Sequence, residues 1–448
     1  MTKRVVVIGG VAAGMSAAAK AKRVDPALEV VVYERGPYIS YGACGMPYFI
    51  AGDVPDYQDL IARTPEQMAE QGVKVHLHHK VVGIAPDAHT VTVRDGEREQ
   101  EFVQEYDRLV IATGARALEL PLPGADLPGL FVLRSLVDGI AVKQFLDQQS
   151  PQQAVVIGGG YVGVEMAETF RRLGLAVTMV IRSGQVMRQQ LDHDVRALVE
   201  DEMARHGVDV ITGTPTGFEG DGRVEGVVLE GGERLAGDVV LLGLGVHPDG
   251  IPLAELAGAA LGRTGAIATD GMMRTNVPDI YAAGDCAEVF HLVTGEPDYV
   301  PLGSTANKQG RTAGENAAGG QAAFAGIVGT MVVRAFDLAV ARTGLTTAEA
   351  EARGYSVRGV KIRASNRARY FPGAAPIHVK LIVDDETDRL LGGQIVGQDG
   401  VAKRVDVLAT ALHHRLTVAD LQQLDLSYAP PFSPVWDPIL VAANVVAK

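Results

Sequence analysis

Two stretches decide the fold: RVVVIGGVAAGMSAA (residues 4–18) and QAVVIGGGYVGVEMA (residues 153–167). Each is a run of β-branched apolar residues, followed by glycines and then by small residues suited to a helix. This order predicts a buried strand, a tight turn and a helix, which together open a dinucleotide-binding unit.

The glycine patterns of the two stretches differ in one place. The second has the full G-x-G-x-x-G at Gly158, Gly160 and Gly163, whereas the first has Gly9 and Gly14 with Val11 in the middle. One such pattern is weak evidence, because αβ turns use glycine for geometry alone. Two copies, each followed by a second strand, are strong evidence for two dinucleotide-binding units.

The end of the second strand distinguishes what the two units bind. LEVVVYERG (28–36) places Glu34 there, and its carboxylate can accept hydrogen bonds from both ribose hydroxyls of an adenosine. LAVTMVIRSG (175–184) places Ile181 there, followed by Arg182. An arginine can pair with a 2′-phosphate, which a carboxylate would repel. We therefore expect two different cofactors, with NADPH, alone or alongside NADH, at the second unit.

The remaining segments indicate further divisions of the chain. Short strands are expected within 73–118, and LPLPGADLPG (120–129) has the proline and glycine content of a linker. From about residue 328 a mixed pattern of strands, followed by a helix at 401–415, carries no glycine fingerprint. This segment is expected to form a separate packing domain.

Composition excludes several classes of protein. The 448 residues are 47% apolar and 21% charged, as in globular proteins, and no apolar stretch is long enough for a bilayer span. The N-terminus lacks a signal-peptide pattern. The net charge of −13 disfavours a nucleic-acid partner. With only Cys44 and Cys286, the chain is expected in a reducing, cytoplasmic compartment.

Together with LVIATGA (109–115) and TNVPDIYAAGDCAE (275–288), the two fingerprints resemble the flavin-dependent pyridine nucleotide–disulfide oxidoreductases. The resemblance implies an α/β fold with two Rossmann-like domains, for FAD and NAD(P)H, and a C-terminal α+β dimerisation domain. The expected boundaries are 1–119 with 249–327 for FAD, 120–248 for NAD(P)H and 328–448 for dimerisation.

The same resemblance assigns the cofactor residues. Those expected to bind FAD are Gly9, Gly10, Ala13, Gly14, Glu34, Arg35, Thr113, Gly114, Gly284 and Asp285. Those expected to bind NAD(P)H are Gly158, Gly160, Tyr161, Val162, Gly163, Arg182 and Gly243.

A single redox cysteine narrows the group. In ISYGACGMPYFI (39–50), Cys44 has no resolving thiol, because Pro47 and Phe49 hold the places that a second cysteine has in dithiol members. Similar single-cysteine relatives are coenzyme A-disulfide reductases, NADH peroxidases and water-forming NADH oxidases. We expect the Cys44 thiolate to be stabilised by a helix N-terminus and by the adjacent flavin. Cys286 is expected to fill the core.

Three positions favour the coenzyme A-disulfide reductases. Ala12 stands where the peroxidases and oxidases carry a histidine. RARYFPGA (367–374) and SYAPPFSPVWDPIL (427–440) resemble segments from which these reductases use one tyrosine each, here Tyr370 and Tyr428. In the family these tyrosines reach the partner's flavin site, so a homodimer with composite active sites is expected.

The resemblance also suggests how the anionic coenzyme A tail is bound, although Ala43 replaces an asparagine that some relatives use. The candidate substrate-binding residues are Ser16, Lys20, Arg23, Ser40 and Lys308. No metal site is expected, since His76, His78 and His79 fit a strand with one wet face.

The resulting hypothesis is an FAD-dependent NAD(P)H:CoA-disulfide reductase, in which electrons pass through FAD to a mixed disulfide of Cys44 with coenzyme A. Two enzymatic alternatives stay open: an NADH oxidase or peroxidase cycling a Cys44 sulfenic acid, and a broader disulfide, persulfide or polysulfide reductase. A flavoprotein redox sensor is the non-enzymatic alternative.

Overall fold

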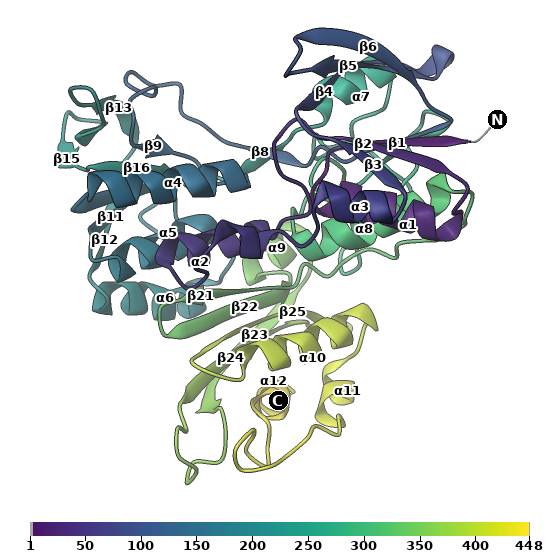
Figure 1. Cartoon of the computed structure of the whole chain (residues 1–448). Helices are drawn as coiled ribbons and strands as arrows, with labels where there is room; N and C mark the ends of the chain where they lie inside the picture. Colours follow the sequence, from purple (N-terminus) through teal and green to yellow (C-terminus); the bar gives the residue numbers. More distant parts are fainter. Residues whose placement is uncertain (1–2, 448) are drawn as a thin grey trace.

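The first glycine stretch begins a parallel five-stranded sheet, seen at the upper right of Figure 1 in the computed structural model, which describes residues 3–447. The strand order is β18-β7-β1-β2-β3. This first unit consists of β1 (Arg4–Ile8), α1 (Ala12–Val24), β2 (Glu29–Tyr33), α3 (Pro65–Glu70), β3 (Val73–His76), β7 (Arg108–Ile111), α7 (Ile251–Ala257), β18 (Ile280–Ala282) and α8 (Gly303–Ala317). Because its strands are valine- and isoleucine-rich and buried, the sheet is covered on both faces, as parallel sheets require.

The second glycine stretch builds a similar sheet, with the order β12-β11-β10-β16-β9. This second unit consists of β9 (Leu130–Phe131), α4 (Leu136–Gln149), β10 (Gln153–Ile157), α5 (Tyr161–Arg172), β11 (Ala176–Ile181), α6 (His193–Arg205), β12 (Val208–Thr212), β13 (Pro215–Glu219), β14 (Gly226–Leu229), β15 (Arg234–Ala236) and β16 (Val239–Leu242). Strands β13, β14 and β15 form a separate antiparallel sheet.

Smaller antiparallel sheets lie beside these units and connect them. An antiparallel three-stranded sheet consists of β4 (His79–Ala85), β5 (Thr90–Asp95) and β6 (Gln100–Glu105). Two antiparallel ribbons consist of β8 (Ala115–Ala117) with β17 (Val246–Pro248), and of β19 (Val289–His291) with β20 (Glu296–Asp298). The short strands expected within 73–118 are therefore present. The β8–β17 ribbon pairs the segment that leaves the first unit with the segment that returns to it.

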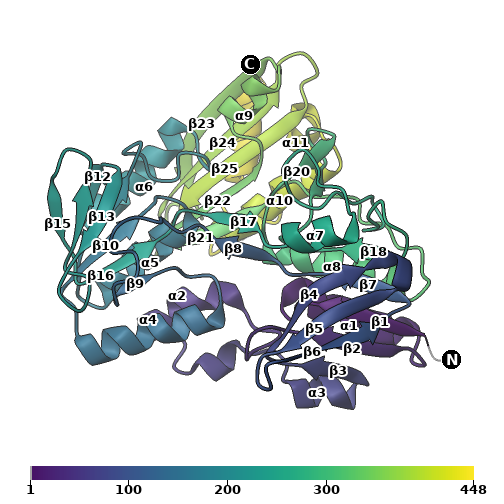
Figure 2. The ribbon, with the colours of Figure 1, turned by 90° about the horizontal axis from the view of Figure 1, so that it is seen from above.

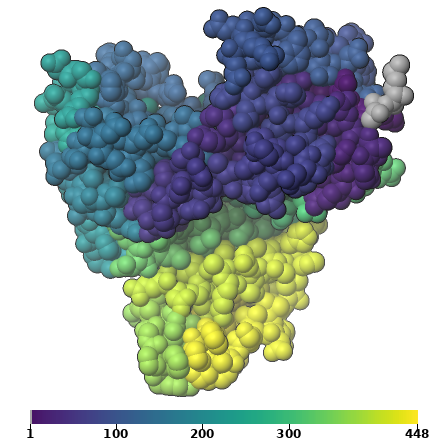
Figure 3. Space-filling model, viewed as in Figure 1, coloured from purple at the N-terminus to yellow at the C-terminus, as the bar shows by residue number. Residues whose placement is uncertain are grey.

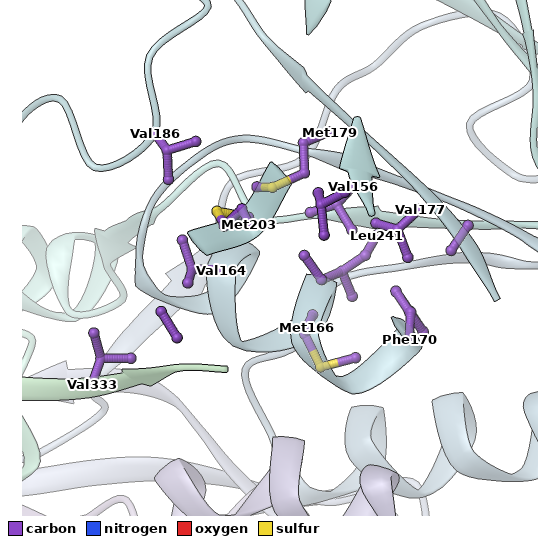
Figure 4. Packing of buried hydrophobic residues seen from close by; sticks show 14 of the residues in the cluster. Val156, Val164, Met166, Phe170, Val177, Met179, Val186, Met203, Leu241 and Val333 are labelled. Carbon is purple, nitrogen blue, oxygen red and sulfur yellow. The ribbon is translucent and has the colours of Figure 1, made fainter. Parts of the chain in front are cut away.

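A short helix carries the first unit into the second. Between β2 and α3 the chain forms η1 (Ala43–Gly45), α2 (Met46–Ala51) and η2 (Tyr57–Leu60), and η3 (Pro86–Ala88) precedes β5. Met46, Phe49 and Ile50 of α2 belong to the same buried cluster as the core of the second unit. Figure 4 shows part of this cluster, in which Phe170, Met179 and Val333 come from different elements.

The C-terminal unit is an antiparallel sheet of order β21-β22-β25-β24-β23. It consists of β21 (Met331–Ala335), β22 (Leu338–Gly344), α9 (Thr347–Ala352), β23 (Val357–Ser365), β24 (Pro376–Asp384), β25 (Leu390–Gly397), α10 (Val401–His413), α11 (Val418–Gln422) and α12 (Pro438–Val446). Helices α10 and α12 pack on this sheet, and α6 of the second unit also contacts it. The predicted fold class, two Rossmann-like units plus an α+β unit, is confirmed.

The close packing of α1 against α8 depends on two glycines. A Cβ on Gly310 would lie 2.2 Å from Ala13 O, and a Cβ on Gly314 would lie 2.1 Å from Ala17 O. Both distances are far below van der Waals contact, so the helices can approach this closely only without side chains there.

We predict that Gly314→Ala lowers the free energy of unfolding by roughly 1–3 kcal/mol, because a methyl group must push α8 away from α1. Gly303→Ala is the matched control, since a Cβ there would meet nothing within 4 Å. Denaturant unfolding of both variants measures the effect. Equal stability of the two would contradict this account of the helix packing.

Candidate functional site

The first glycine turn is too tight for side chains. Gly9 has φ +104°, and a Cβ there would lie 2.3 Å from Ala112 O. A Cβ on Gly14 would lie 1.8 Å from Gly9 O. The turn therefore brings the end of β1 directly against the start of α1, which leaves backbone facing any phosphate bound there.

Glu34 directly follows the end of β2 and lies beside this turn. Its two carboxylate oxygens accept hydrogen bonds from Gly10 N at 2.6 Å and Gly36 N at 2.7 Å. It borders a cavity of about 280 Å³ that Ile8, Val81, Thr113 and Leu253 also line. Apolar walls beside a carboxylate suit an adenosine, so the residues present fit the ADP half of FAD. Arg35, at the rim, pairs with Asp249 at 2.8 Å.

Asp285 lies on a turn that faces the same helix. A Cβ on Gly284 (φ +83°) would lie 2.8 Å from the Ala13 Cβ, so the backbone at Gly284 packs directly against Ala13. The Asp285 carboxylate pairs with Arg134 at 3.0 Å, and burial raises the pKa of Asp285. The Arg134 side chain also lies against Gly114, because a Cβ on Gly114 would be 3.1 Å from Arg134 Nη2. Arg134 is a site residue that the motifs did not reveal.

The second glycine turn repeats the geometry of the first. A Cβ on Gly158 (φ +110°) would lie 2.3 Å from Gly243 O, and one on Gly163 would lie 2.2 Å from Gly158 O. A Cβ on Gly160 would meet nothing within 4 Å, so that glycine leaves its open side to a ligand. Tyr161 and Val162 begin α5, and burial raises the pKa of Tyr161 to about 12.

The loop after β11 lies against this second turn. Met187 N donates to Gly159 O at 2.7 Å, which ties the loop to the fingerprint. Arg182 and Arg188 on this loop are exposed, and neither forms an ion pair with any residue from 3 to 447. Two free guanidinium groups therefore border the second nucleotide site.

A groove separates the two nucleotide units. A cavity of about 730 Å³ lies between them, lined by Arg35, Arg116, Phe131, Arg134 and His247. Figure 3 shows the surface notched between the teal second unit and the blue part of the first.

Cys44 lies in η1, directly before α2, and is exposed. Although part of its side chain is open to solvent, the surrounding protein desolvates the thiol. This desolvation, followed by the negative charges of Glu165 and Asp285, raises the pKa of Cys44, while Arg134 opposes them. The expected lowering by a helix N-terminus is therefore outweighed by the protein's other groups. The main cause is desolvation of the thiol by the surrounding protein, and the charges of carboxylates from two different units add to it.

Cys286 is fully buried, with its Sγ 3.4 Å from Ile111 O and 3.3 Å from Ala283 O. Its predicted role in the core is confirmed. Both cysteines are free.

Each predicted substrate-binding residue has contacts of its own in the structure. Ser16 donates to Asn307 at 2.6 Å, Lys20 pairs with Glu315 at 2.8 Å, and Arg23 donates to Ala19 O within its own helix. Ser40, at φ +49°, joins the first glycine turn through its N–H to Gly10 O. Lys308 lines a cavity of about 730 Å³ between α8 and α10.

Tyr370 and Tyr428 form an exposed pair, with 77% and 47% of their surfaces accessible. A hydrogen bond with Tyr370 raises the pKa of Tyr428. Their loops, between β23 and β24 and between α11 and α12, lie at the lower end of the C-terminal unit in Figure 1, away from α2. Figure 2 shows α2 beside α4 of the second unit.

A buried ion pair holds these two loops together. Arg404, 1% exposed, pairs with Asp437 at 2.9 Å. Its guanidinium also donates to Asn366 O and Ser433 Oγ. The network links the segments on both sides of the tyrosine pair, and sequence patterns did not indicate it.

A second charge network ties α2, α5 and β21 together. Arg334 Nε lies 2.7 Å from Glu168, and its guanidinium stacks 4.9 Å from the Tyr48 ring. Asp53, just after α2, accepts from both Arg172 and Arg334. Sequence patterns did not indicate this network.

One cluster in the described part of the chain has metal-ligand spacing: Glu202, His206 and Asp337. Glu202 is already paired with Arg205, and His206 stacks on Phe336 with ring centroids 4.3 Å apart. The neighbouring guanidinium would repel a cation, so the cluster serves as a contact between α6 and the β21–β22 turn.

Comparisons with known proteins agree with this geometry. Residues 3–310 match the model for pyridine nucleotide-disulphide oxidoreductases, and residues 331–438 match the dimerisation domain of that family. The chain therefore belongs to the pyridine nucleotide-disulphide oxidoreductase family, whose enzymes are oxidoreductases that use FAD and NAD(P)H.

Three relatives narrow the comparison. The chain is 41% identical, over 100% of its length and 99% of the relative, to the NAD(P)H coenzyme A polysulfide/persulfide reductase of Pyrococcus horikoshii. It is 31% identical, over 96% of each, to the coenzyme A disulfide reductase of Staphylococcus haemolyticus. An engineered water-forming NADPH oxidase bound to NADPH, derived from a Lactobacillus brevis enzyme, superposes with a TM-score of 0.94 at 29% identity, covering 99% of this chain and 98% of that one.

Within the described residues, no helix combines the length and apolar character needed to cross a membrane.

Proposed function

We propose that this protein is an FAD-dependent NAD(P)H:CoA-disulfide reductase with Cys44 as its redox thiol. One observation carries the proposal: a single exposed cysteine at the start of α2, where the helix passes from the FAD unit into the core of the NAD(P)H unit. Cys286 is buried and hydrogen-bonded, so no second thiol is available to it. The coenzyme A-dependent names of two relatives support the same substrate class.

The chemistry balances with one thiol. The Cys44 thiolate attacks a CoA disulfide, forming a Cys44–CoA mixed disulfide and releasing one CoA thiolate. Two electrons from NAD(P)H then break the mixed disulfide to a Cys44 thiolate and a second CoA thiolate. Protons convert the released thiolates to thiols. Bound FAD supplies the two-electron relay between NAD(P)H and sulfur, and the protein supplies position and electrostatics.

A persulfide or polysulfide reductase is the second candidate, because the relative at 41% identity has that name. The reacting sulfur atom would again be that of Cys44. The two candidates differ only in the second sulfur partner, so their kcat/KM values on CoA disulfide and CoA persulfide separate them.

We propose that NADPH is used well as a donor, alone or alongside NADH. The engineered NADPH oxidase carries three consecutive replacements to Ala, Arg and Ser and, five residues further, one to Arg. This chain has Ile181, Arg182 and Ser183, and five residues further Arg188. Two unpaired guanidinium groups and a hydroxyl on a loop tied to the fingerprint suit a 2′-phosphate.

The active enzyme would be a homodimer with composite sites. The C-terminal unit matches the family's dimerisation domain. Its exposed Tyr370–Tyr428 pair lies in loops that Figure 1 shows away from α2 of the same chain. The exposed Phe432, Val435 and Trp436 follow Tyr428 in the loop between α11 and α12. A two-fold contact through this surface would deliver each pair to the other subunit's Cys44, because C2 interfaces are isologous. Two free cysteines in a chain of this size fit a cytoplasmic location.

We predict that Cys44→Ser retains FAD and accepts electrons from NADPH but loses CoA-disulfide reduction almost entirely, because no other thiol can form the mixed disulfide. The matched control is Cys286→Ser, which should keep most of the activity. Anaerobic bleaching of the flavin measures electron uptake from NADPH, and a steady-state assay measures CoA-disulfide reduction. Loss of disulfide reduction in Cys286→Ser with normal flavin content would refute the assignment.

For the coenzyme, NADPH is expected to be used well, with a kcat/KM no more than about a hundredfold below that for NADH. Arg182→Ala and Arg188→Ala should each raise KM for NADPH several-fold and leave KM for NADH nearly unchanged. Arg223→Ala, at an exposed arginine of the same unit, is the control. An NADH preference beyond about a hundredfold, roughly 2.7 kcal/mol, would contradict the proposal.

Tyr428→Phe is expected to slow disulfide reduction by roughly 10²–10⁴-fold while electron uptake from NADPH is unchanged, because the phenol protonates the departing CoA thiolate. Heterodimers of one Cys44→Ser subunit and one Tyr428→Phe subunit test its place. In a composite site, the intact tyrosine of the first serves the intact cysteine of the second, and one working site returns. Inactive, verified heterodimers would show that the tyrosine does not act across the interface.

A further inference from the structure

Glu165 is a carboxylate near Cys44 that has no partner. Asp285 pairs with Arg134 at 3.0 Å, and Glu168 pairs with Arg334 at 2.7 Å. By contrast, no residue from 3 to 447 forms a hydrogen bond or ion pair with the Glu165 side chain. It lies on α5, in the helix that begins at the second glycine turn.

Helix geometry directs Glu165 toward the start of α2. Thr169 Oγ1 donates to Pro47 O at 3.2 Å, so this face of α5 packs on α2. Glu165 precedes Thr169 by four residues and shares its face, one turn nearer the N-terminus of α5. Its charge raises the pKa of both Cys44 and Tyr48, so the three side chains lie within electrostatic reach of each other.

The surroundings make Glu165 titrate in the neutral range. Burial, followed by the negative charge of Glu168, raises its pKa to about 7, and Arg334 opposes them. Glu165 is therefore neutral below about pH 7 and ionised above it. The charged groups that face Cys44 itself are Glu165, Asp285 and Arg134.

We propose that Glu165 controls the ionisation of Cys44: neutral Glu165 permits the thiolate, and ionised Glu165 opposes it. Two negative charges in one partly buried place repel each other, so the two groups titrate as a coupled pair. Glu165 thus acts through Cys44 as a tuning residue, and its significance rests on the proposed role of Cys44 as the redox thiol.

The test is the pH dependence of Cys44 alkylation by iodoacetamide in the FAD-bound enzyme, after dithiothreitol has freed the thiol. Peptide mass spectrometry reports the Cys44 rate. Glu165→Gln should match wild type near pH 5.5, where Glu165 is neutral in both. At pH 8 it should react about 3–10-fold faster, which corresponds to a shift of about 0.5–1 unit in the Cys44 pKa.

Two controls isolate the charge. Glu165→Asp should behave like wild type, and Glu351→Gln, which neutralises an exposed glutamate on α9, should change nothing. Flavin content identifies a variant that has not folded, and Glu165→Ser then replaces Glu165→Gln. A rate ratio near 1 at every pH, or an equal effect of Glu351→Gln, would overturn the inference. Neither result depends on turnover of CoA disulfide, so failure of the proposed function would be seen separately.

Discussion

The site depends on the burial of α2 against the second nucleotide unit. Met46, Phe49 and Ile50 lie in one apolar cluster with Val164 and Phe170, although the chain that carries α2 belongs to the first unit. Burying side chains of this size contributes roughly 1.5–3 kcal/mol each. Because Cys44 immediately precedes α2, this packing places the thiol between the two nucleotide sites. The Arg172–Asp53–Arg334 contacts then fix the far end of the helix to both neighbouring units.

Once Cys44 is held there, its chemistry depends on charges that come from separate units. Glu165 belongs to the second unit, Asp285 to the first, and Arg134 to the segment that leads into α4. Helix α2 is only six residues long, and desolvation together with the charges of Glu165 and Asp285 raises the pKa of the thiol. The thiol is therefore tuned by the arrangement of the two units, and any motion between them would change its reactivity. Bound flavin and coenzyme add their own charges to this balance.

The C-terminal unit contributes differently. Its sheet contacts α6 of the second unit, while the buried Arg404–Asp437 pair holds the two tyrosine loops at the opposite end. The two side chains of this ion pair are 1% and 5% exposed, so their desolvation has a large cost that their hydrogen bonds must offset. The pair therefore contributes a specific geometry more than it contributes stability. A fixed geometry of these loops would suit the composite site that we propose, in which the two phenols reach the other subunit.

The sequence by itself determined the two parallel units, because buried strands and glycine turns follow from local patterns: Gly9, Gly14, Gly158 and Gly163 each stand where a Cβ would collide with backbone. It also separated Cys44 from Cys286, since only the first lies in a segment without a core pattern. The tertiary structure alone decided the rest. The contacts of Arg134, Arg334 and Arg404 join segments distant in sequence, and the partners of Ser16 and Lys20 lie on α8, so no local spacing could indicate them. The direction of the Cys44 pKa shift belongs to the same group. It is a sum of burial and charges through space, and that sum exists only when the units are packed together.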